Sequence, residues 1–138
     1  RLIDDLNDEG FALIVTHIRG INMLDLNETE ITNTSIALLT SLEYVHELRI
    51  KGIEAIDNDC IVSLNLINGL TFLHLKGTSI TIDGLLQLHS NPALKDLMFS
   101  DEENAVTSEK MNQLRTLFPA CDFTINSKPY TFEGNYNY

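Results

Sequence analysis

Cys60 and His74 are one pair of residues in this chain whose types could form a nucleophile and a base. A cysteine acts as a nucleophile when an imidazole lies within hydrogen-bond reach of its thiol. Cys60 stands just before Ile61 at an expected helix start, whereas His74 lies in an expected strand. We therefore expect Cys60 to pack as a small apolar side chain, and we predict that the chain is not an enzyme.

Metal and phosphate sites are not predicted either. The remaining histidines, His17, His46 and His89, show no spacing typical of metal ligands. The segment Asp57-Asn58-Asp59 lacks the glycine and the distal glutamate of a calcium loop, and we expect it to cap a helix. Lys76-Gly77-Thr78 lacks the rest of a phosphate-binding loop. The sequence thus gives no reason to expect a cofactor or a metal.

The composition is that of a single folded domain with an acidic surface. The chain has 138 residues, a hydrophobic fraction of 43% and a net charge of −11. Such a charge repels phosphate backbones and anionic lipid, so we expect no nucleic-acid or membrane partner. No apolar run approaches the roughly 18 residues that a membrane span needs. Two cysteines favour a cytoplasmic, bacterial setting, while a removed leader or an upstream segment before Arg1 stays an alternative.

A repeated pattern divides the chain into units of similar length. Each unit contains a segment in which two apolar residues flank one outward-pointing residue. These segments are Leu24-Asp25-Leu26, Leu48-Arg49-Ile50, Leu73-His74-Leu75, Leu97-Met98-Phe99 and Phe123-Thr124-Ile125. Their first residues lie 24, 25, 24 and 26 positions apart. A period of 20 to 50 residues indicates a repeat architecture.

Each of the first four segments is followed by an expected helix start and an apolar stripe. The starts are Ile31-Thr32, Ile56-Asp57, Ile80-Thr81 and Val106-Thr107, where Thr and Asp are suitable N-caps. Three inward columns follow at helical spacing: Ile36, Ile61, Leu85 and Met111; Leu39, Leu64, Leu88 and Leu114; and Leu42, Ile67, Asn91 and Leu117. From each start to the next strand the distance is always 19 residues, for example from Ile31 to Ile50. The length variation therefore falls in surface loops.

This pattern resembles the leucine-rich-repeat family, in a bacterial-style or cysteine-containing-like variant reading LxLxxTxIT. The segments 24–32 and 73–81 match it best. The resemblance implies an α/β right-handed solenoid with a short parallel sheet on its concave side and helices on its convex side. We expect one domain over 1–138, with a half repeat or cap at 1–22, four repeats at 23–120, and a last strand and tail at 121–138. Leu6-Asn7, Phe11 and Ile14 predict the helix of that first half repeat.

The outward residues of the predicted strands form three columns on the concave face. The columns are Met23, Glu47, Phe72, Asp96 and Asp122; Asp25, Arg49, His74, Met98 and Thr124; and Asn27, Lys51, Lys76, Ser100 and Asn126. Basic side chains therefore gather on two adjacent repeats, beside an aromatic residue and a methionine. The predicted partner-binding residues are Arg49, Lys51, Phe72, His74, Lys76 and Met98.

The resemblance implies a protein–protein interaction module, such as an adaptor. We expect the basic residues to bind an acidic segment of a protein partner. In the alternative interpretation the same face is solvated and neutralised by Asp25, Glu47 and Asp96. Two more functions agree with the pattern, namely an immunity or inhibitor-type protein that neutralises an enzyme, and a structural fragment or cap of a longer array. An uncovered end of the solenoid could also pair with a second copy of the chain.

Overall fold

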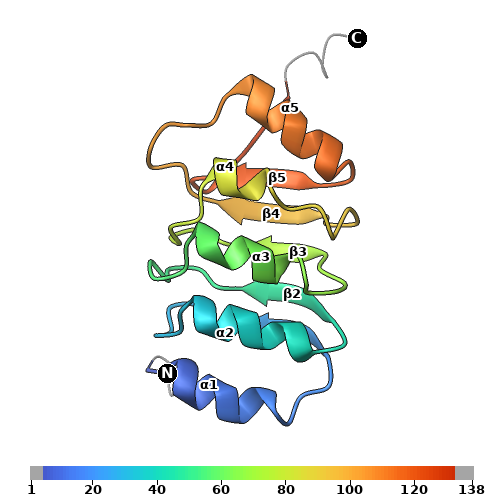
Figure 1. Cartoon of the computed structure of the whole chain (residues 1–138). Coiled ribbons are helices and arrows are strands. Elements are labelled where there is room, and N and C mark those ends of the chain that lie inside the picture. Colours follow the sequence, from blue (N-terminus) through green and yellow to red (C-terminus); the bar gives the residue numbers. More distant parts are fainter. Residues whose placement is uncertain (1–4, 133–138) are drawn as a thin grey trace.

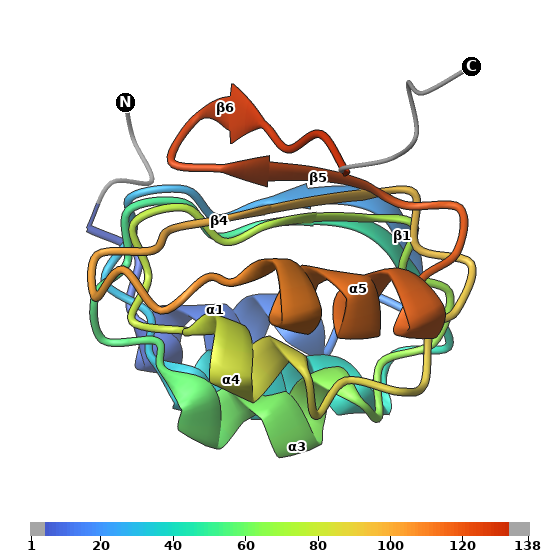
Figure 2. The ribbon, with the colours of Figure 1, turned by 90° about the horizontal axis from the view of Figure 1, so that it is seen from above.

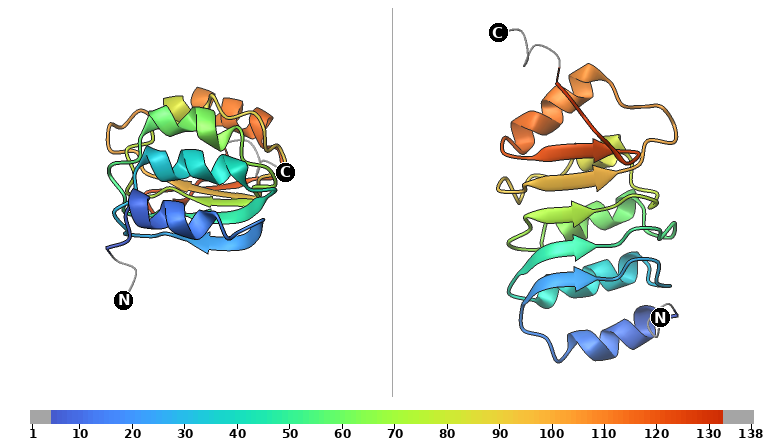
Figure 3. Two further views of the ribbon diagram at one scale, coloured as in Figure 1. Left: turned by 60° about the horizontal axis from the view of Figure 1, so that its bottom comes forward. Right: turned by 180° about the vertical axis from the view of Figure 1, so that it is seen from behind.

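The protein has a mixed α/β fold built on one six-stranded sheet. The computed structural model describes residues 5–132. Its strands are β1 (Ile21–Asp25), β2 (Val45–Arg49), β3 (Phe72–His74), β4 (Asp96–Phe99), β5 (Asp122–Ile125) and β6 (Lys128–Pro129). Their order in the sheet is their order in the sequence, as Figure 1 and the rear view in Figure 3 show. The first five strands are parallel, and β6 runs antiparallel to β5.

All the helices pack on one side of this sheet (Figure 2). They are α1 (Asp8–Val15), α2 (Asn33–Leu38), α3 (Ile61–Leu64), α4 (Ile82–Leu85) and α5 (Ser108–Leu117), with 3₁₀ turns η1 (Leu39–Ser41) and η2 (Asn58–Cys60). Each connection between parallel strands thus passes over the same face and returns to the sheet. None of the helices in residues 5–132 has the length and apolar character needed to cross a membrane.

The register of the strands follows the sequence spacing. Leu24 pairs with Leu48, Leu48 with Leu73, Leu73 with Leu97, and Leu97 with Phe123. All five side chains are buried, so equivalent positions of successive units form one apolar column. Because side chains alternate along a strand, the residues on either side of each column point to the opposite face of the sheet.

The predicted N-caps are confirmed in all four units. Thr32, Asp57, Thr81 and Thr107 each accept a hydrogen bond from a backbone N–H of the following turn. Three caps also bond to the polar residue that follows the cap of the preceding unit. These cross-unit pairs are Asp8 with Thr32, Asn33 with Asp57, and Asn58 with Thr81. Neighbouring units are therefore joined by polar contacts at the edge as well as by the apolar core.

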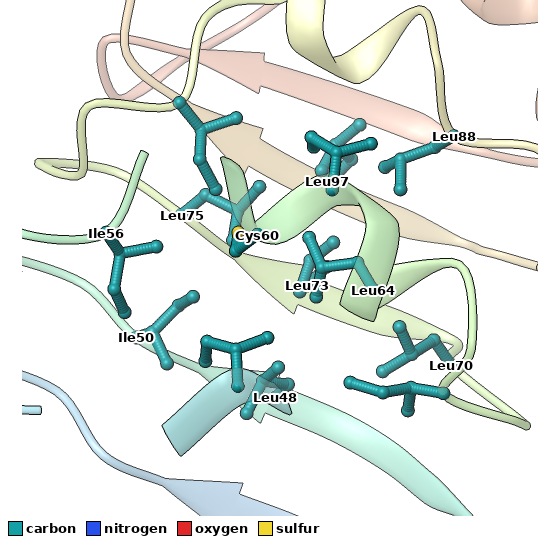
Figure 4. Close-up of a cluster of buried hydrophobic side chains, with 14 of the residues drawn as sticks. Leu48, Ile50, Ile56, Cys60, Leu64, Leu70, Leu73, Leu75, Leu88 and Leu97 are labelled. Carbon is teal, nitrogen blue, oxygen red and sulfur yellow. The ribbon is translucent and has the colours of Figure 1, made fainter. Parts of the chain in front are cut away.

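The core runs between the sheet and the helices, and Figure 4 shows its middle part, where Cys60 lies among leucines and isoleucines. The first two inward columns are buried in every unit. One predicted inward residue is wrong, because in α1 the side chain of Val15 is buried and Ile14 is 44% exposed. At the end of α5 Leu117 packs against the core but is only partly buried, whereas Phe118 beside it is buried. These are the two longest helices, and their full α-helical turns bring residues four apart onto the core-facing stripe.

The two ends of the sheet differ. β6 pairs with β5, and Tyr130 and Phe132 pack against the core, with the rings of Phe132 and Phe123 edge to face at 6.0 Å. The guanidinium of Arg115 lies 4.1 Å from the centre of the Phe132 ring. The segment after Ser127 therefore covers the last unit as far as Phe132. The rest of the expected tail, 133–138, lies outside the described residues. At the other end of the sheet, β1 has no strand partner on its outer edge within residues 5–132.

Candidate functional site

The side chains that point away from the helices form a surface that we call the open face. It consists of the outward positions of β1–β5 and of the third predicted column just beyond the strands, Asn27, Lys51, Lys76, Ser100 and Asn126. Within residues 5–132 no helix covers it (Figure 2). The pairs Glu47–Phe72, Phe72–Asp96, Arg49–His74 and His74–Met98 are in register. The first two predicted columns therefore exist as predicted. Backbone hydrogen bonds from Glu28 to Lys51 and from Gly52 to Lys76 carry the register into the third.

Arg49, Lys51, His74 and Lys76, which we call the basic patch, lie on two adjacent units of this face. Neighbouring parallel strands are about 4.8 Å apart, and residues two apart along a strand are about 6.6 Å apart. The four side chains thus occupy the corners of a small rectangle, and all four are half-buried. One carboxylate placed above its centre could contact several of them.

Arg49 is held in place by two contacts within the face. Its guanidinium lies 4.4 Å from the centre of the Phe72 ring and 3.3 Å from a carboxylate oxygen of Glu47. A cation over an aromatic ring is attracted by the negative face of the ring. Arg49 and Phe72 therefore form one flat surface, a contact that the sequence alone did not reveal.

The two lysines of the basic patch are more available to a partner than Arg49 is. Lys51 makes one long ion pair, in which its Nζ lies 3.9 Å from Glu28. Lys76 forms no ion pair with any residue of the described range. Of the three acidic residues that could neutralise the patch, Glu47 contacts Arg49, whereas no ion pair joins Asp25 or Asp96 to it in residues 5–132. The neutralisation of this face is therefore partial.

His74 occupies one corner of the basic patch, and its surroundings favour the uncharged imidazole. Burial lowers the pKa of the imidazole, and the nearby cations Lys51, Arg49 and Lys76 lower it further, while Asp25 opposes them. The Nδ1 atom of His74 is buried and has no hydrogen-bond partner. At neutral pH the ring is therefore a neutral side chain surrounded by positive charge.

Glu47, Asp96 and Asp122 occupy one outward column of the same face, and we call them the acidic strip; Phe72 lies between Glu47 and the other two. Asp96 and Asp122 are direct neighbours across β4 and β5. Burial raises the pKa of Asp96, and repulsion from Asp122 and Glu47 raises it further. The sequence indicated this pair of neighbouring carboxylates, because Asp96 and Asp122 are consecutive members of one outward column.

Cys60 and His74, the cysteine and histidine considered as a nucleophile and a base, do not form a reactive pair. Cys60 is buried, and burial together with the carboxylates of Asp57 and Asp59 raises its pKa to about 12. Such a thiol is protonated at neutral pH and is a poor nucleophile. The structure thus places Cys60 in the core and His74 on the open face. The part of the chain that the structure describes also contains no cluster of three or more His, Cys, Asp or Glu suited to a metal ion.

A cavity of about 430 Å³ lies between the loops that follow β3 and β4, beside the open face. Glu54 and residues 77–81 line one part of it, and residues 100–103, in the loop after β4, line the rest. The carboxylate of Asp101 is already used, since it accepts hydrogen bonds from the N–H groups of Ala105 and Val106. The cavity is therefore lined mainly by carboxylate and hydroxyl side chains.

The open face is therefore the strongest candidate for a functional surface. It combines partly unneutralised cations, a flat aromatic contact and a separate group of carboxylates. Neither a scan against protein-family models nor a search of the curated proteins finds a match for this chain.

Proposed function

We propose that this chain is a leucine-rich-repeat solenoid that acts as a protein–protein interaction module and not as an enzyme. The regular spacing of the units supports the family, and the matching order of strands in sequence and sheet agrees with it. The open face corresponds to the concave side of such a solenoid, the side on which extended binding surfaces are found.

The observation that supports binding most directly is that the lysines of the basic patch are poorly neutralised. In a chain with a net charge of −11, Lys76 has no acidic partner in residues 5–132 and Lys51 has only a distant one. The same patch includes Arg49, which contacts Phe72, and His74, which pairs with Met98 across β3 and β4; Phe72 and Met98 provide half-buried apolar area. Interface centres combine aromatic residues, methionine and arginine in this way. The partner we propose is a protein that presents an acidic segment to this patch.

The test is a comparison of partner binding by the wild type and by the double variant Lys51→Glu/Lys76→Glu. These positions are better suited than Arg49, because reversing Arg49 would also remove its contact with Phe72. Immobilised protein is used to capture partners from extracts of the native host, and the dissociation constant of the purified partner is then measured by calorimetry. We expect the variant to bind at least about tenfold more weakly, since charge pairs in an interface are commonly worth more than about 1.4 kcal/mol.

The matched control is Lys95→Glu/Lys128→Glu, which makes the same charge change at two exposed lysines outside the basic patch. It should bind the partner with nearly wild-type affinity. Circular dichroism should show that both variants are folded. Equal binding by the wild type and the Lys51/Lys76 variant would show that the basic patch is not the binding surface.

A further inference from the structure

Two charged pairs of the open face, Lys51 with Lys76 and Asp96 with Asp122, lie at opposite corners of it, and their separation can be worked out from the register. The basic patch ends at Lys51 and Lys76, two places beyond β2 and β3. The acidic strip has its closest pair, Asp96 and Asp122, at the starts of β4 and β5. The two pairs are two strand spacings apart along the sheet and four residues apart along the strand.

These steps correspond to about 10 Å across the strands and about 13 Å along them, at spacings of about 4.8 Å and 3.3 Å. The direct distance between the two pairs is therefore about 16 Å. Met98, in the central column of β4, lies close to the middle of this line, and Phe72 lies to one side of it. An extended peptide covers the same distance in about five residues.

The two charged groups are not neutralised by one another. Glu47 is engaged by Arg49 at 3.3 Å, but Asp96 and Asp122 form no ion pair with any residue in the described range, and neither does Lys76. Because Asp96 is half-buried beside two other carboxylates, a cation placed there would relieve their repulsion. The face therefore offers unsatisfied charge of both signs.

We propose that the open face binds an extended segment of a partner protein that carries both charges, with an acidic side chain over Lys51 and Lys76 and a basic side chain over Asp96 and Asp122. The two charged residues are five positions apart, and an apolar side chain between them packs on Met98. This inference rests on the proposed function and specifies the chemistry of the partner. Charge complementarity favours such a segment over a purely acidic one, which the net charge of −11 would repel.

The experiment is a selection from a random dodecapeptide library displayed on phage, carried out on the full chain. Three baits are compared: the wild type, Lys51→Glu/Lys76→Glu, and Asp96→Asn/Asp122→Asn. From the wild type we expect enrichment of peptides that carry an acidic and a basic residue five positions apart, in either order. The lysine variant should lose the preference for the acidic residue, and the aspartate variant should lose only the preference for the basic one.

The affinity of a selected peptide is then measured by fluorescence anisotropy. Replacing its basic residue by glutamine should weaken binding to the wild type about fivefold and leave binding to Asp96→Asn/Asp122→Asn unchanged. Shortening the spacing between its charged residues to two positions should cause a similar loss. Glu30→Gln/Glu102→Gln is the matched control, because it makes the same charge change at exposed residues outside the open face and should keep the wild-type preference.

The possible failures are distinguishable. Acidic peptides without a basic residue, selected equally by the wild type and the aspartate variant, would overturn this inference and leave the proposed function standing. Peptides whose selection is unchanged by Lys51→Glu/Lys76→Glu, or the absence of any enriched sequence, would overturn both. The aspartate variant is expected to fold, since neither carboxylate accepts a hydrogen bond within residues 5–132 and their mutual repulsion is removed.

Discussion

Asp8 joins α1 to the unit that begins with β1, and its replacement by alanine tests how neighbouring units are held together. Its carboxylate accepts hydrogen bonds from the N–H of Thr32 at 2.8 Å, from the hydroxyl of Thr32, and from the hydroxyl of Ser35 at 2.6 Å. Ser35 is completely buried. Burial by itself would raise the pKa of Asp8, but the bonds from Ser35 and Thr32 outweigh it and hold the pKa below its usual range.

The expected loss follows from these three bonds. A hydrogen bond to a charged group contributes about 1.5–3 kcal/mol when it is well shielded, and less when one partner is near solvent. Because Asp8 is half-buried, we take about 1 kcal/mol for each bond, including the cost of leaving the Ser35 hydroxyl without its partner. Asp8→Ala should therefore lower the free energy of unfolding by about 3 kcal/mol, a large part of the roughly 5–15 kcal/mol of a typical domain.

The assay is urea denaturation at a series of pH values, with Glu9→Ala as the matched control. Glu9 lies in the same first turn of α1 and is exposed, so it reports the effect of the helix dipole and of the net charge without the bonds. Because the folded-state pKa of Asp8 is depressed, its contribution is present above the unfolded pKa near 3.8 and is lost as the pH falls through the folded value. The difference from wild type should stay constant between about pH 7 and 5 and shrink below about pH 4.

A loss from Asp8→Ala no larger than that from Glu9→Ala at neutral pH would refute the role of Asp8 as a link between units. A large loss that did not change with pH would refute it too, because the ionised carboxylate could not then be its source. A double-mutant cycle with Ser35→Ala separates the direct bond from indirect effects, and we expect a coupling of about 1 kcal/mol.

Two further predictions concern the turn after β3 and the thiols. Gly77→Ala should lower the free energy of unfolding by about 2 kcal/mol, measured by urea denaturation. The reason is that Gly77 has φ +80 and an added Cβ would lie 3.0 Å from the backbone of Gly52. A loss below about 0.5 kcal/mol would mean that the backbone shifts easily. Burial and neighbouring carboxylates raise the pKa of both Cys60 and Cys121 to about 12, so Ellman's reagent at about pH 8 should label neither thiol quickly in the folded protein and both in urea. One rapidly labelled thiol in the folded protein would contradict this assignment.

The sequence by itself predicted the five parallel strands, the caps and the columns of the open face, whereas it predicted a tail where β6 lies. Its unit spacing of 24 to 26 residues predicts which residues pair across the sheet, because parallel strands of successive units must align their apolar positions. The caps at Thr32, Asp57, Thr81 and Thr107 were predictable because N-capping depends on local residue types. The burial of Cys60 followed from its place beside an apolar helix stripe.

Only the tertiary structure decided which residue of each longer helix faces the core and which charges of the open face are satisfied. Val15 is buried instead of Ile14, and Phe118 is buried beside the partly buried Leu117, because the inward stripe depends on how far a helix continues beyond its first turn. Packing against the sheet sets that length. Likewise, Glu47 contacts Arg49 while Lys76 and Asp96 form no ion pair in residues 5–132. Ion pairs depend on side-chain reach and burial across strands that lie far apart in sequence, and the order of residues alone does not determine either.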